Sequence, residues 1–157
     1  MNEISQDMWE FAKTFDSRFP LIFITTNGFV KKNGKAVMGR GCAQEARDMF
    51  PGVDTLLGDS LKSKGNSVAY IGTWDIDGFT YHLFSFPVKH NWWEDADLDL
   101  IEKSCAYLQK LIELKLPIET IILPRPGCGN GKLDWETQVK PLMLSYLDFD
   151  NVYICHK

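Results

Sequence analysis

The sequence lacks long apolar runs, closely spaced cysteine pairs and any excess of basic charge. The net charge of its 157 residues is −4, which argues against a general affinity for bare nucleic acid but leaves room for a local basic patch. No apolar stretch approaches the ~20 residues of a membrane span. The polar, acidic segment 1–7 does not resemble a secretory signal. We therefore expect a cytoplasmic protein without a membrane-spanning segment, which stands alone rather than fused to other domains.

The cysteines are few and scattered. The four are too far apart in sequence to suggest a metal site, and free thiols in a reducing compartment explain them most simply: Cys42, Cys105, Cys128 and Cys155. We expect no metal and no cofactor. The apolar fraction of 45% and the charged fraction of 24% are ordinary, and the length fits one monomeric domain spanning residues 1–157.

Strand-like and helix-like patterns alternate along the chain. Strands are expected at 21–26, 67–73, 79–86, 118–123 and 152–155, with a turn at Asp77-Gly78. Helices are expected at 43–50, 54–64, 97–114 and 134–147, the last with Pro141 in the first turn of its main part. Strands that are apolar on both faces, alternating with helices, predict a three-layer α/β/α sandwich around a mixed, mostly parallel sheet. Ligands of such sheets bind beyond the carboxyl ends of the strands.

The segment 124–136 is the most informative stretch of the sequence. Gly127, Gly129 and Gly131 alternate between the apolar run 121–123 and the expected helix at 134–147. Glycines let backbone N–H groups approach a bulky anion closely. A strand, a glycine loop and a helix start together form a phosphate site. A plain tight turn explains this loop equally well when it is considered alone.

A second glycine-bearing loop, 27–42, joins the strand at 21–26 to the helix at 43–50. Gly39 and Gly41 precede that helix, where backbone donors and the helix dipole favour a phosphate. Asn27 follows the strand and is placed to hydrogen-bond a sugar hydroxyl. Considered singly, Asn27-Gly28 is a turn and Arg40 is a solvated charge. Two such loops at neighbouring strand ends suit a diphosphate held between them.

These motifs resemble the two ligand loops of macro domains, which bind ADP-ribose. The matching segments are Thr26-Asn27-Gly28, 36–41 and 127–135, and the resemblance extends over nearly the whole chain. Phe86-Pro87-Val88-Lys89 and Leu133-Asp134-Trp135 are most similar to the branch that contains the human terminal ADP-ribose glycohydrolase and the antitoxin macro domains that remove ADP-ribose from DNA. The resemblance implies the macro domain fold and an ADP-ribosyl hydrolase, of bacterial or phage origin, that acts preferentially on a DNA base adduct.

The resemblance also implies a role for each matching residue. Asp7 would accept a hydrogen bond from the adenine amino group, unless it is a solvated acid near a helix start. Asn27 would act at the distal ribose. The remaining ligand-binding positions, which include the backbone groups along the ribose and diphosphate, are Met8, Met38, Gly39, Arg40, Gly41, Cys42, Gly127, Cys128, Gly129, Asn130 and Gly131.

Lys89 is the predicted catalytic residue, together with Asn27. In the similar branch, the equivalent lysine attacks or polarises the anomeric carbon of the distal ribose. A lysine with a lowered pKa is a nucleophile able to form a Schiff base with a ring-opened ribose. Lys31, Lys32 and Arg40 would lower this pKa if they approach. The alternative is an ordinary surface lysine that ends a strand.

The chain departs from the similar branch at two positions. The human enzyme has an acidic residue in its glycine loop where this sequence has Gly131, so a paired lysine and carboxylate mechanism is not fully reproduced. Asp134 is the nearest acid, and it fits the N-cap of the following helix equally well. The antitoxin pattern has a glycine where this chain has Lys132, which adds charge near the phosphates.

The segment after Lys89 is aromatic and basic. His90, Trp92 and Trp93 could stack a nucleobase, with contact to single-stranded DNA as a consequence. The alternative is that the tryptophans pack under the long helix, which we favour for one of them. Cys42 and Cys128 lie in the ligand loops and are interpreted as small loop residues rather than nucleophiles.

Three other functions remain open at this stage. A reader or scavenger would bind ADP-ribose without turnover, and Gly131 favours it. A phosphatase would act on ADP-ribose 1″-phosphate. A nicotinamide-dependent dehydrogenase is the weakest alternative, because no Gly-x-Gly-x-x-Gly motif follows the first expected strand.

Overall fold

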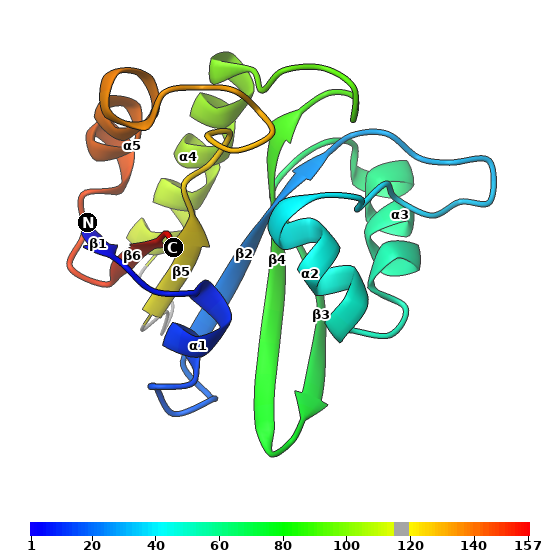
Figure 1. Cartoon of the computed structure of the whole chain (residues 1–157), viewed down its shortest axis with the longest axis horizontal. Helices are drawn as coiled ribbons and strands as arrows, with labels where there is room; N and C mark the ends of the chain where they lie inside the picture. Colours follow the sequence, from blue (N-terminus) through cyan, green and yellow to red (C-terminus); the bar gives the residue numbers. More distant parts are fainter. Residues whose placement is uncertain (115–119) are drawn as a thin grey trace.

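The computed structural model describes residues 1–114 and 120–157 (Figure 1). Its strands are β1 (Asn2–Ile4), β2 (Pro20–Asn27), β3 (Ala69–Ile76), β4 (Phe79–Lys89), β5 (Thr120–Pro124) and β6 (Val152–Cys155). Its helices are α1 (Met8–Ala12), α2 (Gly41–Met49), α3 (Val53–Lys64), α4 (Leu98–Glu113) and α5 (Lys140–Leu147), and the π-helical segment η1 (Trp135–Val139) leads directly into α5.

The strands form one sheet in the order β1-β6-β5-β2-β4-β3. Only the pair of β3 and β4 is antiparallel among the strand pairs of the described residues. These two strands are joined by the expected turn at Asp77-Gly78, in which both residues have positive φ. The prediction of a mixed, mostly parallel sheet is therefore confirmed.

Helices cover both faces of the sheet, as Figure 1 shows. On one face, α1, α2 and α3 pack over a core that contains Trp9, Phe50 and Leu57. On the other face, α4 and α5 pack over a core that contains Phe23, Ile101 and Met143. Two separate apolar clusters, one on each side of the sheet, are what a three-layer α/β/α sandwich requires.

Most elements agree with the sequence patterns to within a few residues. The helical stretch expected at 134–147 is divided into η1 and α5, and Pro141 lies in the first turn of α5. The strand expected at 118–123 is β5, although residues 118–119 lie outside the described part of the chain. β1 and α1 were missed because three and five residues are too short to show a periodicity.

The register between β2 and β4 brings two predicted site residues together. Thr26 lies beside Pro87, but the register shifts after Thr26, so that Asn27 lies beside Lys89. A local irregularity of this kind redirects side chains at the end of a strand. Both residues thus lie at the carboxyl end of the sheet. Within the described residues, no helix is long and apolar enough to cross a membrane.

Candidate functional site

A cavity of about 410 Å³ lies at the carboxyl ends of β2, β4 and β5. It is bounded by the first loop (residues 28–40) and the glycine loop (residues 125–134), which follow β2 and β5. This is the edge of the sheet at which α/β proteins bind their ligands. The cavity is lined by Thr25, Thr26, Asn27, Val37, Gly39, Arg40, Gly41, Cys42, Ala43, Val88, Lys89, Trp92, Pro124, Arg125, Gly127, Gly129, Asn130 and Gly131.

The structure brings most of the predicted site residues to this cavity. Those that line it are Asn27, Gly39, Arg40, Gly41, Cys42, Lys89, Gly127, Gly129, Asn130 and Gly131. Four others lie outside its lining. Met8 and Met38 are buried in the core, and Cys128 lies within the glycine loop with its Sγ directed to the Pro126 carbonyl at 3.4 Å.

Asp7 is the fourth predicted residue outside the cavity lining. It is the N-cap of α1, where its carboxylate accepts a hydrogen bond from the Glu10 N–H at 3.1 Å. The same carboxylate pairs with the Lys157 ammonium at 3.2 Å. Its proposed contact with adenine therefore stays a prediction, and it would have to compete with Lys157.

Lys89 projects between the two loops. Its Nζ donates a hydrogen bond to the Asn130 carbonyl at 3.3 Å, which connects the end of β4 to the glycine loop. Burial and the nearby Arg40 guanidinium lower the pKa of Lys89, and Lys132 adds to this effect while Asp95 opposes it. Arg40 thus acts as expected. Lys132 also lowers the pKa of Lys89, whereas Lys31 and Lys32, which the sequence suggested for this effect, do not contribute to it.

The backbone of Lys89 is held by contacts on both sides. The Asn66 side chain donates a hydrogen bond to the Lys89 carbonyl at 3.0 Å. The Gly28 N–H donates to the His90 carbonyl at 3.1 Å, so the start of the first loop is tied to the residue after Lys89. These contacts fix the position from which the Lys89 side chain enters the cavity.

Asn27 bridges the ends of the first loop. Its amide nitrogen donates to the Val37 carbonyl at 3.1 Å, and its amide oxygen accepts from the Phe29 N–H at 3.0 Å. The amide retains a second N–H and a second acceptor lone pair. Asn27 therefore shapes the loop and still offers polar groups to a ligand in the cavity.

The N-terminus of α2 contributes unpaired backbone donors. α2 begins at Gly41 without a side-chain cap, and Gly41, Cys42 and Ala43 line the cavity. The first N–H groups of a helix have no partners within the helix and attract anions. This arrangement fits the phosphate site that the sequence predicts here. Cys42 itself is half-buried beside Thr25, and burial raises the pKa of its thiol, which agrees with a non-nucleophilic role.

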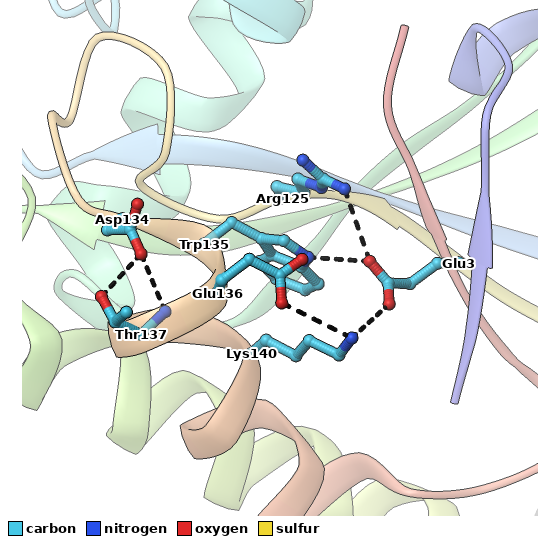
Figure 2. Close-up of polar contacts among 7 residues, drawn as sticks. All are labelled: Glu3, Arg125, Asp134, Trp135, Glu136, Thr137 and Lys140. Atoms are coloured by element: carbon cyan, nitrogen blue, oxygen red, sulfur yellow. Dashed lines mark hydrogen bonds and ion pairs between the residues drawn. The ribbon is translucent and has the colours of Figure 1, made fainter.

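The glycine loop rests on a polar network centred on Glu3 of β1 (Figure 2). The Glu3 carboxylate accepts from the Trp135 indole N–H at 2.8 Å, and it pairs with Lys140 at 2.7 Å and Arg125 at 3.4 Å. The Arg125 guanidinium also lies over the Trp135 ring, 5.1 Å from its centroid. Arg125 lines the cavity, so the network connects the cavity lining to β1 through Glu3 and to the start of α5 through Lys140.

Asp134 is a helix cap in this structure. Its carboxylate accepts from the Thr137 N–H at 2.8 Å and from the Thr137 hydroxyl at 2.6 Å, as Figure 2 shows. It does not line the cavity. Gly131, at which the sequence resemblance predicts the position of the acid of the human enzyme, is tightly packed. A Cβ atom there would lie 2.5 Å from the Gly127 carbonyl oxygen and 2.7 Å from the Ala96 Cβ.

Several residues of the site do not follow from sequence patterns. Thr26 lines the cavity, and its buried hydroxyl has no hydrogen-bond partner within the described residues. The same holds for Arg125 and Asn66. Their roles depend on contacts with Glu3 and Lys89, which are distant in sequence, so no local pattern reveals them.

The prediction that one tryptophan packs under the long helix is wrong. Trp92 and Trp93 remain 49% and 58% exposed. Trp92 lines the cavity, and the ring of Trp93 meets Phe29 of the first loop edge-on, with centroids 5.5 Å apart. The Asp97 N–H bonds to the Val88 carbonyl, so residues 89–96 form a loop that is closed at its base and leaves both rings outside the core.

The remaining thiols are poor nucleophiles, because burial disfavours their thiolate forms. Burial raises the pKa of Cys128 to about 11 and that of Cys105 and Cys155 to about 12. Residues 1–114 and 120–157 contain no group of three or more histidine, cysteine or acidic side chains placed to hold a metal ion.

Comparison with known proteins identifies the fold. The chain is 28% identical to a Mycobacterium tuberculosis DNA ADP-ribosyl glycohydrolase over 123 residues, and 29% identical over 136 residues to a Thermosipho africanus protein described as a DNA ADP-ribosyl transferase and glycohydrolase fusion. These matches cover 76% and 75% of the chain. The chain spans about a third (34%) of the length of either relative. No family model matches the sequence.

Solved structures give the same result. The macrodomain of M. tuberculosis DarG superposes with a TM-score of 0.75 at 25% identity, over 99% of this chain and 97% of that one. T. africanus DarTG, solved in complex with ADP-ribose, superposes with a TM-score of 0.71 at 24% identity, over 88% of this chain and 38% of that one. The chain therefore has the macrodomain fold, and the resemblance to the antitoxin branch is confirmed.

Proposed function

We propose that this chain binds ADP-ribose in the cavity between the first loop and the glycine loop and hydrolyses an ADP-ribosyl linkage, preferentially one to a DNA base. The observation that carries the proposal is the position of Lys89, beside Asn27 and between the two loops, with a lowered pKa. The names of the curated relatives, which are DNA ADP-ribosyl glycohydrolases, support the choice of substrate.

The chemistry of the cavity walls supports ADP-ribose as the ligand. The uncapped start of α2 and the backbone of the glycine loop provide N–H donors from two sides for the diphosphate. The cations Arg40 and Lys89 lie in the same lining. Asn27 provides an amide for the hydroxyls of the distal ribose, which places the anomeric carbon of that ribose at the Lys89 end.

Lys89 acts on the anomeric carbon as a nucleophile. The neutral amine attacks C1″, the bond from C1″ to the base breaks, and the departing base takes up a proton. The bond from C1″ to the ring oxygen O4″ then breaks, and the proton that Nζ loses ends on O4″, which leaves a Schiff base between Lys89 and C1″ of the opened ribose. Water then adds to C1″ and the bond to Nζ breaks, which releases ADP-ribose and restores the amine. The lowered pKa of Lys89 increases the fraction of neutral amine at a given pH.

The test compares two substrates and three lysine variants. The substrates are a single-stranded oligonucleotide that carries ADP-ribose on a thymidine and a protein that carries it on a glutamate. Lys89→Ala should lower the release of ADP-ribose from the oligonucleotide by at least about a hundredfold while free ADP-ribose still binds. Lys89→Arg keeps the charge but cannot deprotonate, so it should be equally inactive. Lys103→Ala, an exposed lysine on α4, is the matched control.

The pH profile gives an independent check on the nucleophile. The rate should rise with pH as Lys89 deprotonates, and its midpoint should lie below the ordinary pKa of a lysine. A rate that is independent of pH, or full activity of Lys89→Arg, would exclude Lys89 as the nucleophile. Release from the modified protein alone would change the substrate to a glutamyl linkage.

A reader that binds ADP-ribose without turnover is the second candidate. Asp134 is engaged with Thr137 and Gly131 has no side chain, so among residues 1–114 and 120–157 no carboxylate lines the cavity to assist Lys89. Binding of ADP-ribose without release from either substrate would establish this function. Release of phosphate from ADP-ribose 1″-phosphate would instead indicate a phosphatase.

A further inference from the structure

The exposed tryptophans at the cavity mouth form the strongest unexplained feature of the surface. Trp92 and Trp93 are about half exposed, and their rings meet nearly at right angles, with centroids 5.4 Å apart and an interplanar angle of 88°. Large aromatic side chains that stay open to solvent beside a cavity are typical of a contact site. The fold gains little from leaving them exposed.

The segment that carries these tryptophans is fixed at both ends. The Asp97 N–H bonds to the Val88 carbonyl at 2.9 Å, and the Ala96 N–H bonds to the Gly131 carbonyl at 3.0 Å. The His90 ring nitrogen lies 2.7 Å from the Asp97 carboxylate, which also caps α4. Ordering of this surface before a ligand arrives lowers the entropy that binding must overcome.

The aromatic surface is continuous with the catalytic end of the cavity. Trp92 lies in the same cavity lining as Lys89, three residues further along the chain. Trp93 packs against Phe29, which follows Asn27 by two residues. The segments that follow β2 and β4, the strands that end at Asn27 and Lys89, therefore carry the aromatic rings. Whatever is attached to C1″ of a bound ADP-ribose leaves the cavity beside them.

Cations lie where this surface meets the cavity, since Arg40 and Lys89 line the cavity together with Trp92. Lys31 and Lys32 are exposed in the first loop just after Phe29, and Lys132 is exposed in the glycine loop. Three acids lie in the same segment, and each has a partner. Glu94 accepts from Asn91 at 2.7 Å, Asp95 pairs with Lys132 at 3.8 Å, and Asp97 lies 2.7 Å from the His90 ring nitrogen. Exposed aromatic rings next to lysines are the usual combination for single-stranded nucleic acid.

We infer that Trp92 and Trp93 form a stacking subsite for unpaired nucleobases next to the ADP-ribose cavity, where they hold the strand that carries the ADP-ribose. Trp92 contacts the modified base as it leaves the cavity, and Trp93 stacks a neighbouring base of the same strand. The perpendicular rings require these two bases to be splayed apart, which a single strand permits and a duplex does not. The inference rests on the proposed function, because it takes the ADP-ribose to lie with C1″ at Lys89.

Binding measurements with Lys89→Ala as the background isolate this subsite from turnover. The probes are free ADP-ribose, an oligonucleotide modified on one thymidine, and the same oligonucleotide with abasic sites flanking that thymidine. In this background, Trp93→Ala should weaken binding of the intact oligonucleotide by about tenfold, since loss of a stacked base has an effect of this order. Binding of free ADP-ribose and of the abasic oligonucleotide should not change. Trp93→Phe should restore most of the loss.

Tyr107→Ala provides the matched control. Tyr107 is 48% exposed on α4, outside the cavity lining. Its removal tests whether any exposed aromatic ring affects the oligonucleotide, and the expected result is no change. An equal loss for Tyr107→Ala, or no loss for Trp93→Ala, would overturn the subsite.

The remaining outcomes separate the subsite from the proposed function. If the wild-type chain did not bind free ADP-ribose, both the proposed function and the inference would be contradicted. Tight binding of free ADP-ribose, with the oligonucleotide bound no more tightly, would leave the function and overturn the subsite. If Trp93→Ala weakened the binding of free ADP-ribose as much as that of the oligonucleotide, the Trp93 ring would be assigned to the adenine instead, and the subsite would be overturned. A stronger effect of Trp93→Ala on a modified RNA or peptide than on the DNA would overturn the choice of DNA.

Discussion

The two loops that border the cavity contain similar glycine patterns but are held in different ways. The glycine loop rests on a network whose centre, Glu3, is more than a hundred residues away in sequence. The first loop is held by the side chain of Asn27, the strand residue directly before it, and by the neighbouring α3, where the Ala36 N–H bonds to the Asp54 carbonyl at 2.9 Å.

Two glycines of the glycine loop, Gly131 and Gly129, differ in how much space surrounds them. Gly131 is buried and has no room for a Cβ, whereas Gly129 is exposed, lines the cavity and has no neighbouring atom within 4 Å of an added Cβ. One glycine is required by packing and the other leaves space for a ligand. A single alternating motif thus serves two physical purposes, and substitutions can separate them.

The largest expected effect is that of Gly131→Ala. The added Cβ would overlap the Gly127 carbonyl oxygen and the Ala96 Cβ, both of which belong to well-held segments. We expect the free energy of unfolding to fall by about 3 kcal/mol. Urea denaturation followed by circular dichroism measures this change. An unchanged midpoint would mean that the glycine loop is less tightly packed than the structure indicates.

Gly131→Asp should lower the free energy of unfolding by at least as much as Gly131→Ala. An acid therefore cannot be introduced at this position by one substitution.

Gly58→Ala tests the attachment of the first loop to α3. A Cβ at Gly58 would overlap the Gly34 carbonyl oxygen at the exposed turn of this loop. Alanine normally stabilises a helix relative to glycine by about 1 kcal/mol, and the overlap should reverse that gain to a net loss of about 2 kcal/mol. The loss is smaller than for Gly131 because an exposed turn can shift. Denaturation of both variants under the same conditions checks the order, and a net stabilisation would contradict it.

Gly129→Ala should affect the ligand and not the fold. The added methyl group enters open space at the cavity, so the free energy of unfolding should stay within about 0.5 kcal/mol of the wild type. The affinity for ADP-ribose should fall by about tenfold, because the backbone of the loop can no longer approach the diphosphate as closely. Isothermal titration calorimetry measures the affinity. Unchanged affinity would mean that Gly129 does not face the ligand.

Glu3→Gln weakens the network under the glycine loop. The Glu3 carboxylate is about 30% exposed and its ion pairs are partly screened, so we expect a loss of about 1 kcal/mol at neutral pH. Hydrogen bonding to Lys140 holds the pKa of Glu3 below its usual range, with Trp135 and the charges of Lys140 and Arg125 acting in the same direction against burial. A group with a lowered pKa in the folded state stabilises above its ordinary pKa, and this stability is lost as the pH falls.

The pH dependence of Glu3→Gln follows from that sign. The difference in stability from the wild type should be largest at neutral pH and should shrink as the pH drops below about 4.3, where a free carboxyl titrates. Denaturation at a series of pH values measures it. A difference that grows in acid would show that another group dominates the network.

The short and the long elements differ in how far sequence patterns predict them. α4, with its repeated apolar positions, and the Asp77-Gly78 turn follow local rules that hold in almost any context. β1 and α1 are too short to carry such a signal, yet β1 provides Glu3 and Asp7 caps α1. Elements of this size are stabilised by the partners that they meet in the folded chain.

The sequence by itself determined the alternation of strands and helices, the two glycine-bearing loops and the resemblance that points to ADP-ribose, because each depends on neighbouring residues. Only the tertiary structure decided which residues meet. The register shift that places Asn27 beside Lys89, the network that supports the glycine loop and the exposure of Trp92 and Trp93 all depend on contacts between distant segments. Such contacts are set by the packing of the whole sheet, and no local pattern encodes them.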